Sequence, residues 1–144
     1  MPKYDKDTGA LFTELKTDKN VADYLRRNGS EFMISLRDYL EKLLAEKNLT
    51  KRAVIERSGL NREYAYHIFS GDKKNPSRPK ILALAIAMGL NLDETQYLLR
   101  HAEQNLLYPR DSWDAVIISA IEQKLNVVQT NELLNRLGES VLLG

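Results

Sequence analysis

The segment ILALAIAMGL, residues 81–90, is apolar on nearly every side when it is drawn as a helix. A surface helix needs a polar face, so a helix of this composition must lie at the centre of the molecule with other elements packed around it. Pro79 suits the first turn of such a helix, and Gly89 favours its end. The chain is therefore predicted to fold around one buried helix.

Helical periodicity, with apolar residues three and four apart, runs through the rest of the chain, and no useful length alternates with period two. The fold class is therefore predicted to be all-α. The predicted helices cover residues 10–16, 19–28, 31–47, 51–57, 61–69, 79–88, 94–104, 111–124 and 129–137. Thr50, Asn61 and Asp111 are predicted N-caps, and Asp93 with Gln96 resembles a capping box.

The composition excludes several classes of protein. No apolar run approaches the roughly 18 residues that cross a bilayer, and residues 1–12 lack the apolar core of a secretion signal. The absence of cysteine excludes disulfides and thiolate metal sites and fits a cytoplasmic protein. The two histidines, His67 and His101, stand far apart in the sequence, and no nucleotide-binding or nucleophile motif is present. We therefore expect no enzyme, no cofactor and no metal.

Positive charge is concentrated in one part of the chain. Residues 50–80 carry eight basic and three acidic side chains, a net charge of +5, whereas residues 91–144 carry four and eight, a net charge of −4. Localised positive charge is what binding to phosphates requires. An ordinary solvated surface is the alternative reading of the same charges.

The basic segment also has a specific order of elements. Thr50 begins one helix, Gly59 and Leu60 make a short turn, Asn61 begins a second helix, and Gly71 ends it. The turn favours glycine because it needs a residue without the steric penalty of Cβ at positive φ. This order is that of a helix-turn-helix.

Residues 49–94, LTKRAVIERSGLNREYAYHIFSGDKKNPSRPKILALAIAMGLNLDE, resemble the lambda-repressor-like (Xre/Cro type) helix-turn-helix domain. The matching features are Thr50, Gly59, Leu60, Ile68, Gly71, Asn75-Pro76-Ser77 and Met88-Gly89-Leu90. The resemblance implies a five-helix DNA-binding domain over residues 31–104. An N-terminal helical arm, residues 1–30, and a C-terminal helical extension, residues 105–144, would flank this domain.

The sequence departs from the family pattern at four positions, one of which is Lys51, where the family often has Gln. Ile55 and Ala65 exchange the usual small and large residues, and the summed volume is kept if they face each other. Phe69 stands where the family often has Glu, which suggests an additional apolar contact with Tyr64 or with an added helix.

The resemblance implies roles for individual residues. The helix 61–69 would lie in the major groove and read bases through Asn61, Arg62, Glu63, Tyr66 and His67. Phosphates would be bound by Thr50, Lys51, Arg52, Lys73, Lys74 and Arg78. Plain solvation is the alternative for Arg62, Lys73 and Lys74, stabilisation of the helix dipole is the alternative for Glu63, and core packing is favoured for Tyr64.

The expected function is sequence-specific binding of duplex DNA by a bacterial or phage-type transcriptional regulator, more specifically a repressor that acts as a homodimer. Trp113, Ile117 and Ile121 share one stripe of the extension, which serves either dimerisation or closure of the monomer core. The alternative function is a protein-interaction module, such as an antitoxin-like or kinase-binding adaptor that has lost DNA binding. Tyr64, Tyr66 and Phe69 support this alternative, and a protein partner would also find docking surfaces on the N-terminal arm or the C-terminal helices.

Overall fold

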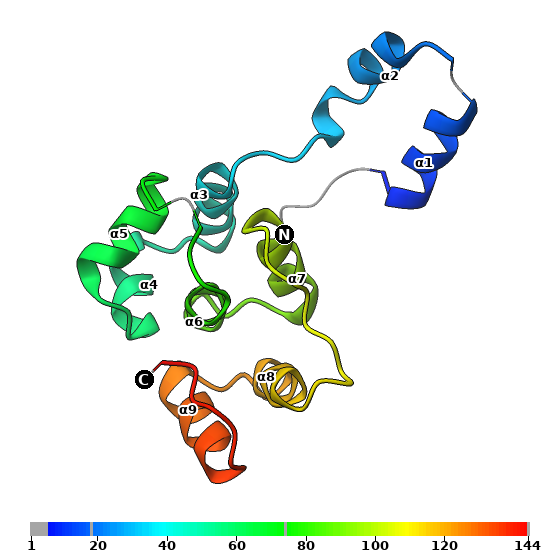
Figure 1. Cartoon of the computed structure of the whole chain (residues 1–144). Coiled ribbons are helices and arrows are strands. Elements are labelled where there is room, and N and C mark those ends of the chain that lie inside the picture. The colour runs from blue at the N-terminus through cyan, green and yellow to red at the C-terminus, as the bar shows by residue number, and fades with distance from the viewer. Residues whose placement is uncertain (1–5, 18, 74, 144) are drawn as a thin grey trace.

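The computed structural model describes residues 6–17, 19–73 and 75–143, and within these ranges it contains helices and no strand. The α-helices are α1 (Thr8–Thr17), α2 (Val21–Arg27), α3 (Leu36–Lys47), α4 (Lys51–Ser58), α5 (Arg62–Ser70), α6 (Arg78–Ala87), α7 (Leu92–His101), α8 (Ser112–Glu122) and α9 (Val127–Arg136). A short 3₁₀ helix covers Gly29–Glu31. The prediction of an all-α fold is confirmed (Figure 1).

Helix α6 is the centre of the molecule, as its apolar sequence predicts. Every residue from Ile81 to Ala87 is buried, and α6 contacts α4, α7 and α9 (Figure 1). One buried cluster joins α6 to the helix-turn-helix, and it includes Val54, Ile55, Ala65, Ile68, Leu82, Leu84, Ala85 and Met88. Leu60 packs against this cluster and is half-buried. Ile55 and Ala65, the positions at which the usual small and large residues are exchanged, are both buried in that cluster, and Phe69 is buried there too.

At two of the helix starts that differ from the prediction, nearby residues make the better cap. The helix predicted from residue 31 begins at Leu36, since the Ser35 hydroxyl accepts the N–H of Asp38 at 3.1 Å. The predicted cap at Asp93 is wrong, because Asn91 and Glu94 form the capping box and the helix runs over Leu92–His101. Gln96 instead binds the backbone of Leu107 through both amide atoms, at 2.8 and 3.0 Å.

Helix α7 is joined to α3 by a stacked pair of rings. His101 is buried and lies parallel to Tyr39, with 3.9 Å between the ring centroids. Burial lowers the pKa of His101, while the hydrogen bond to the carbonyl of Tyr97 opposes that shift. His101 is therefore a packed side chain of the domain and lies on a different element from His67.

The C-terminal extension closes the core of the monomer. Ile117, Ile121, Leu134 and Leu142 belong to the same buried cluster as α6. Trp113 is half-buried, and its Nε1–H donates to the carbonyl of Ser140 at 2.8 Å. The apolar stripe of α8 is thus used within the chain, which favours the core-closing alternative over dimerisation through this stripe.

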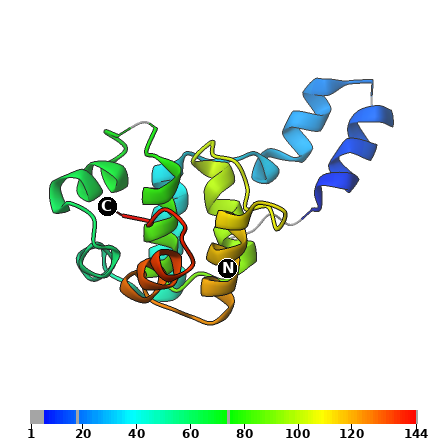
Figure 2. The same ribbon diagram turned by 60° about the horizontal axis from the view of Figure 1, so that its bottom comes forward.

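Helices α1 and α2 form a hairpin that stands away from the rest of the chain in both views (Figures 1 and 2). We call residues 6–33 the α1–α2 hairpin. Its helices contact each other, and residues 32–35 lead from it into α3. By their spacing Val21, Tyr24 and Leu25 share one face of α2, but only Tyr24 is buried. Helix α2 ends at the C-cap Asn28, and the next residue, Gly29, begins the 3₁₀ helix without a positive φ.

Candidate nucleic-acid interface

The helix-turn-helix consists of α4, the turn at Gly59 and Leu60, and α5. The Thr50 hydroxyl accepts the N–H of Ala53 at 3.2 Å, which begins α4. Gly59 ends α4 with a φ of 73°, and Gly71 ends α5 with a φ of 86°. The predicted caps and turn are therefore confirmed, and they fix the direction of α5 against α3 and α4.

Helix α5 has one buried face and one open face. Ala65, Ile68 and Phe69 are buried in the core. On the other face lie Arg62, Glu63, Tyr66 and His67, all of them exposed. Four of the five side chains expected to read bases are thus brought together on a surface that neither the α1–α2 hairpin nor the C-terminal extension covers.

Asn61, the fifth predicted base reader, is also the N-cap of α5. Its Oδ1 accepts the N–H of Tyr64 at 3.0 Å. Bidentate pairing of Asn with adenine needs the amide oxygen and the NH₂ group together. Because the oxygen is engaged in the cap, the NH₂ group is better placed to donate to a single base acceptor, such as guanine O6 or thymine O4.

Arg62 and Tyr66 form a pair one helical turn apart. The guanidinium carbon of Arg62 lies 5.9 Å from the centre of the Tyr66 ring, within the range of a cation–π contact. This contact limits the positions of both side chains and leaves the donors of the guanidinium for an external acceptor. The pair therefore presents a hydrogen-bonding fork beside an aromatic ring.

His67 lies between two carboxylates. Its ring nitrogens are 3.9 Å from Glu63 and 3.4 Å from Asp72. Hydrogen bonds from the Ser70 hydroxyl and then from His67 lower the pKa of Asp72. Negative charge consequently borders the far end of the open face, and phosphates are repelled there.

The predicted phosphate ligands of α4 carry ion pairs within the protein. Lys51 Nζ lies 2.7 Å from Glu41 of α3, and Arg52 Nε lies 3.3 Å from Glu56. Lys51 is partly exposed and Arg52 is well exposed, so either can exchange its carboxylate for a phosphate at a modest cost. Lys73 Nζ lies 5.5 Å from the centre of the half-buried Tyr64 ring. Lys74 lies outside the described residues.

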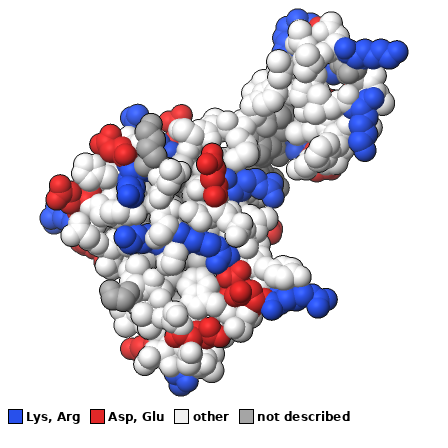
Figure 3. All heavy atoms as spheres, viewed as in Figure 1, with Lys and Arg blue, Asp and Glu red and all other residues white. Residues whose placement is uncertain are grey.

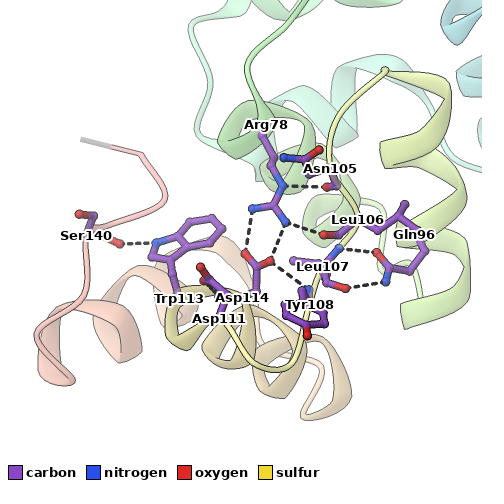
Figure 4. A network of polar contacts seen from close by, with 10 residues as sticks. All are labelled: Arg78, Gln96, Asn105, Leu106, Leu107, Tyr108, Asp111, Trp113, Asp114 and Ser140. Carbon is purple, nitrogen blue, oxygen red and sulfur yellow. Dashed lines mark hydrogen bonds and ion pairs between the residues drawn. The ribbon is translucent and has the colours of Figure 1, made fainter.

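Arg78 differs most from its predicted role. Its guanidinium makes a bidentate ion pair with the buried carboxylate of Asp114, at 2.8 Å on both sides (Figure 4). It also donates to the carbonyls of Asn105 and Leu106, at 2.8 and 3.1 Å. All three guanidinium nitrogens are thus engaged by the C-terminal extension. We therefore remove Arg78 from the residues expected to bind phosphate.

Two basic residues that the sequence did not assign to the interface lie beside it. Lys80 Nζ is 4.1 Å from the centre of the Tyr64 ring. The side chain of Arg37, from the first turn of α3, packs against Gly71, where its Cδ lies 3.4 Å from the position that a Cβ would take. Lys80 is one of the eight basic residues of the segment 50–80. Arg37 lies outside that segment, and it comes close to α5 only because α3 packs against α5.

Charges of both signs are interleaved on the face shown in Figure 3, and no uniformly basic surface is seen there. Carboxylates from outside the basic segment also pair with two of its cations, Glu41 with Lys51 and Asp114 with Arg78. Among the described side chains, the basic residues of this segment without a carboxylate at ion-pair distance are Arg57, Arg62, Lys73 and Lys80.

The described part of the chain holds no group of three metal-ligating side chains. None of its helices is long and apolar enough to cross a bilayer.

An outward-facing second helix, set by a glycine turn on a buried bundle, defines a DNA-binding helix-turn-helix domain. Comparison with protein families agrees, because residues 40–94 match the family model described as Helix-turn-helix. The matched segment contains both helices and the turn of the motif, in agreement with the resemblance to Xre, lambda-repressor-like helix-turn-helix domains. Comparisons with curated proteins and with solved structures give no match.

Proposed function

We propose that the protein is a transcriptional repressor that reads a specific duplex sequence with α5. The observation that carries this proposal is the open face of α5, where Arg62 and Tyr66 stand side by side on a helix-turn-helix. Arginine pairs with guanine O6 and N7 in the major groove, and a tyrosine ring contacts the methyl group of thymine. Occupation of an operator by such a domain is sufficient for repression, because it blocks access to the DNA. The cytoplasm of a bacterial cell is the compartment in which such a regulator meets its DNA.

A single α5 cannot specify a long operator. The helix has nine residues, and the exposed side chains expected to read bases all lie in its first two turns. Specific operators are commonly read by two copies on half-sites about 34 Å apart. We therefore propose that two chains bind together to a palindromic site.

The first experiment is selection of binding sequences from random duplexes, followed by titration at several salt concentrations. Arg62→Ala and Tyr66→Ala should each weaken the selected site by about 1–3 kcal/mol and relax the sequence preference. Arg110→Ala is the matched control, because Arg110 is exposed and lies outside the helix-turn-helix. If no sequence is enriched, or if Arg62 and Tyr66 do not affect binding, α5 does not read DNA.

The same titrations separate the two predicted groups of residues. Lys51→Ala and Lys73→Ala should weaken all duplexes alike and reduce the salt slope by about one unit for each lost phosphate contact. A loss of specificity in these variants, with an unchanged salt slope, would contradict their assignment to phosphates.

A protein-interaction module is the second candidate function. The observation that favours it is the pair of carboxylates, Glu63 and Asp72, beside His67 on the open face of α5. Acidic groups repel DNA, and an exposed Tyr with Arg is typical of protein interfaces. If the DNA selection fails, Arg62 and Tyr66 are the first residues to substitute in tests of binding to a protein partner.

A further inference from the structure

The surface of the α1–α2 hairpin is unusually apolar. Six of the twelve large apolar side chains that are exposed in the described part of the chain lie on it, namely Phe12, Leu15, Val21, Leu25, Phe32 and Met33. Their exposed fractions run from 43% to 61%. The hairpin is a small part of the chain, so this concentration is far above that of the remaining surface and marks an interaction site.

Polar side chains link the two helices of the hairpin, whereas apolar side chains are exposed on its surface. Between the helices, the Glu14 carboxylate accepts from the Asn28 amide at 2.7 Å, and Lys6 donates to both residues at 2.7 and 2.8 Å. Asn28 is 1% exposed. Phe12 and Leu15 are three residues apart on α1, and Val21 and Leu25 are four apart on α2, so each pair shares one face of its helix.

The rest of the described chain offers no comparable patch for this surface. The other exposed apolar side chains are spread over α5, residues 106–108, α9 and the segment after it. The hairpin also stands away from the body in both views (Figures 1 and 2). The one surface of matching character in the described chain is therefore the same hairpin on another molecule.

The charge of the hairpin is compatible with self-association. Residues 6–33 carry five basic and five acidic side chains, a net charge of zero. Two neutral surfaces do not repel each other, whereas a polyanion or an acidic membrane surface would select a basic one. Two hairpins that cover six apolar side chains on each copy at roughly 80 Å² apiece bury about 1,000 Å², the size of a small specific interface.

We propose that the α1–α2 hairpins of two chains pack against each other and form a two-fold four-helix contact that covers the six exposed apolar side chains Phe12, Leu15, Val21, Leu25, Phe32 and Met33. The contact depends only on the hairpin. Its consequence, the placement of two α5 helices on one duplex, rests on the proposed DNA-binding function. The C-terminal extension is not part of this interface, since its apolar stripe is buried within its own chain.

The first test is sedimentation of the full chain without DNA over a dilution series. The wild type should form a dimer, and Phe12→Asp with Leu25→Asp should raise the dimer dissociation constant by about a hundredfold or more, because each charge enters a symmetric interface twice. The control is Val128→Asp with Leu137→Asp, two side chains on or beside α9 that are 66% and 57% exposed. The control should remain dimeric. A monomeric wild type, a dimeric hairpin variant, or a monomeric control would each overturn the proposal.

A second test does not depend on the folding of the charged variants. The chain has no cysteine, so a single introduced cysteine reports one position. Leu15→Cys should give a covalent dimer with a flexible bis-maleimide cross-linker, which does not require the two sulfurs to meet, and Val128→Cys should not. Equal cross-linking of the two variants would indicate random collision and contradict the proposal.

DNA titrations of the hairpin variant distinguish this proposal from the proposed function. If the DNA-binding function and the hairpin contact are both correct, the variant Phe12→Asp with Leu25→Asp binds a single half-site as tightly as wild type does. The variant does not bind more tightly when the duplex contains a second half-site. Dimerisation without sequence-specific DNA binding would leave the hairpin contact valid and refute the function alone. Sequence-specific DNA binding by a monomeric wild type would support the function and refute the hairpin contact.

Discussion

At the level of single residues, Asp114 defines what Arg78 does. Its carboxylate is buried, and it also accepts the N–H of Tyr108 at 3.0 Å. A buried carboxylate needs a cation and hydrogen-bond donors, because water no longer solvates it. Arg78 supplies the cation from the first turn of α6, so it links the central helix to the C-terminal extension (Figure 4).

Replacement of Arg78 by Ala should therefore act on stability. Loss of one partner of a buried ion pair is costly, and because Asp114 keeps its backbone donor we expect a loss of about 3 kcal/mol in the free energy of unfolding. Urea unfolding measures this change. Arg110→Ala, which removes an exposed arginine from the neighbouring loop, should change the free energy of unfolding by less than about 0.5 kcal/mol. Equal stability of the two variants would show that the ion pair contributes nothing to the fold.

At the level of elements, the turn at Gly59 determines where α5 points. Gly59 has a φ of 73°, a region that L-residues with a Cβ rarely adopt. An added Cβ would lie 3.4 Å from Leu143 Cδ1, an ordinary contact distance. The backbone conformation, more than the available space, is thus the reason for glycine at this position.

Gly59→Ala should lower the free energy of unfolding by about 1–2 kcal/mol, the cost of the left-handed conformation for a residue with a Cβ. Gly29→Ala provides the comparison, since φ at Gly29 is not positive and no atom lies within 4 Å of the added Cβ. That variant should be neutral or slightly more stable, because alanine reduces the freedom of the unfolded chain. Thermal unfolding of both variants checks the difference, and a neutral Gly59→Ala would exclude strain at the turn.

At the level of the whole molecule, the helix-turn-helix and the C-terminal extension share one core. The buried cluster runs from Tyr39 of α3 through α6 to Leu142. Small domains with a continuous core unfold in one cooperative step. The extension should consequently unfold together with the DNA-binding helices.

Ile117→Asp tests this cooperativity. Ile117 is fully buried on α8, and an unpaired charge there should cost about 3 kcal/mol or more. The signal of the single tryptophan, Trp113, and the helical circular dichroism should then shift together to lower temperature. Ala115→Asp, on an exposed position of the same helix, should cost less than about 1 kcal/mol. Two separate transitions in the wild type would show that the extension is an independent unit.

The sequence predicts the features of this fold that depend on local chemistry. The buried α6, the caps Thr50, Asn61 and Asp111, and the glycine turn follow from the residues at those positions, and each is confirmed. The start of α3 and the cap of α7 were missed because several polar residues compete there, and Ser35 and Asn91 make the better caps.

The parts of the candidate site that depend on distant residues could not be predicted. The partner of Arg78 lies 36 residues along the chain, and the partner of Lys51 comes from α3. No local pattern carries these pairings, since they result from how helices meet in space. The exposure of Arg62, Glu63, Tyr66 and His67 was predictable, because helical spacing places them opposite Ala65 and Ile68.

The ion pair between Lys51 and Glu41 also bears on how quickly DNA would be found. Electrostatic steering depends on the field ahead of the binding surface, and that field is weaker when cations already have internal partners. Encounters with random duplex should then be brief. They should also be only moderately sensitive to salt, because few counterions are released from the DNA until Lys51 leaves Glu41 and contacts a phosphate. Glu41 would in this way act as an internal counterion, which shortens the time spent on the wrong sequence and leaves the recognition of the right one to Arg62 and Tyr66.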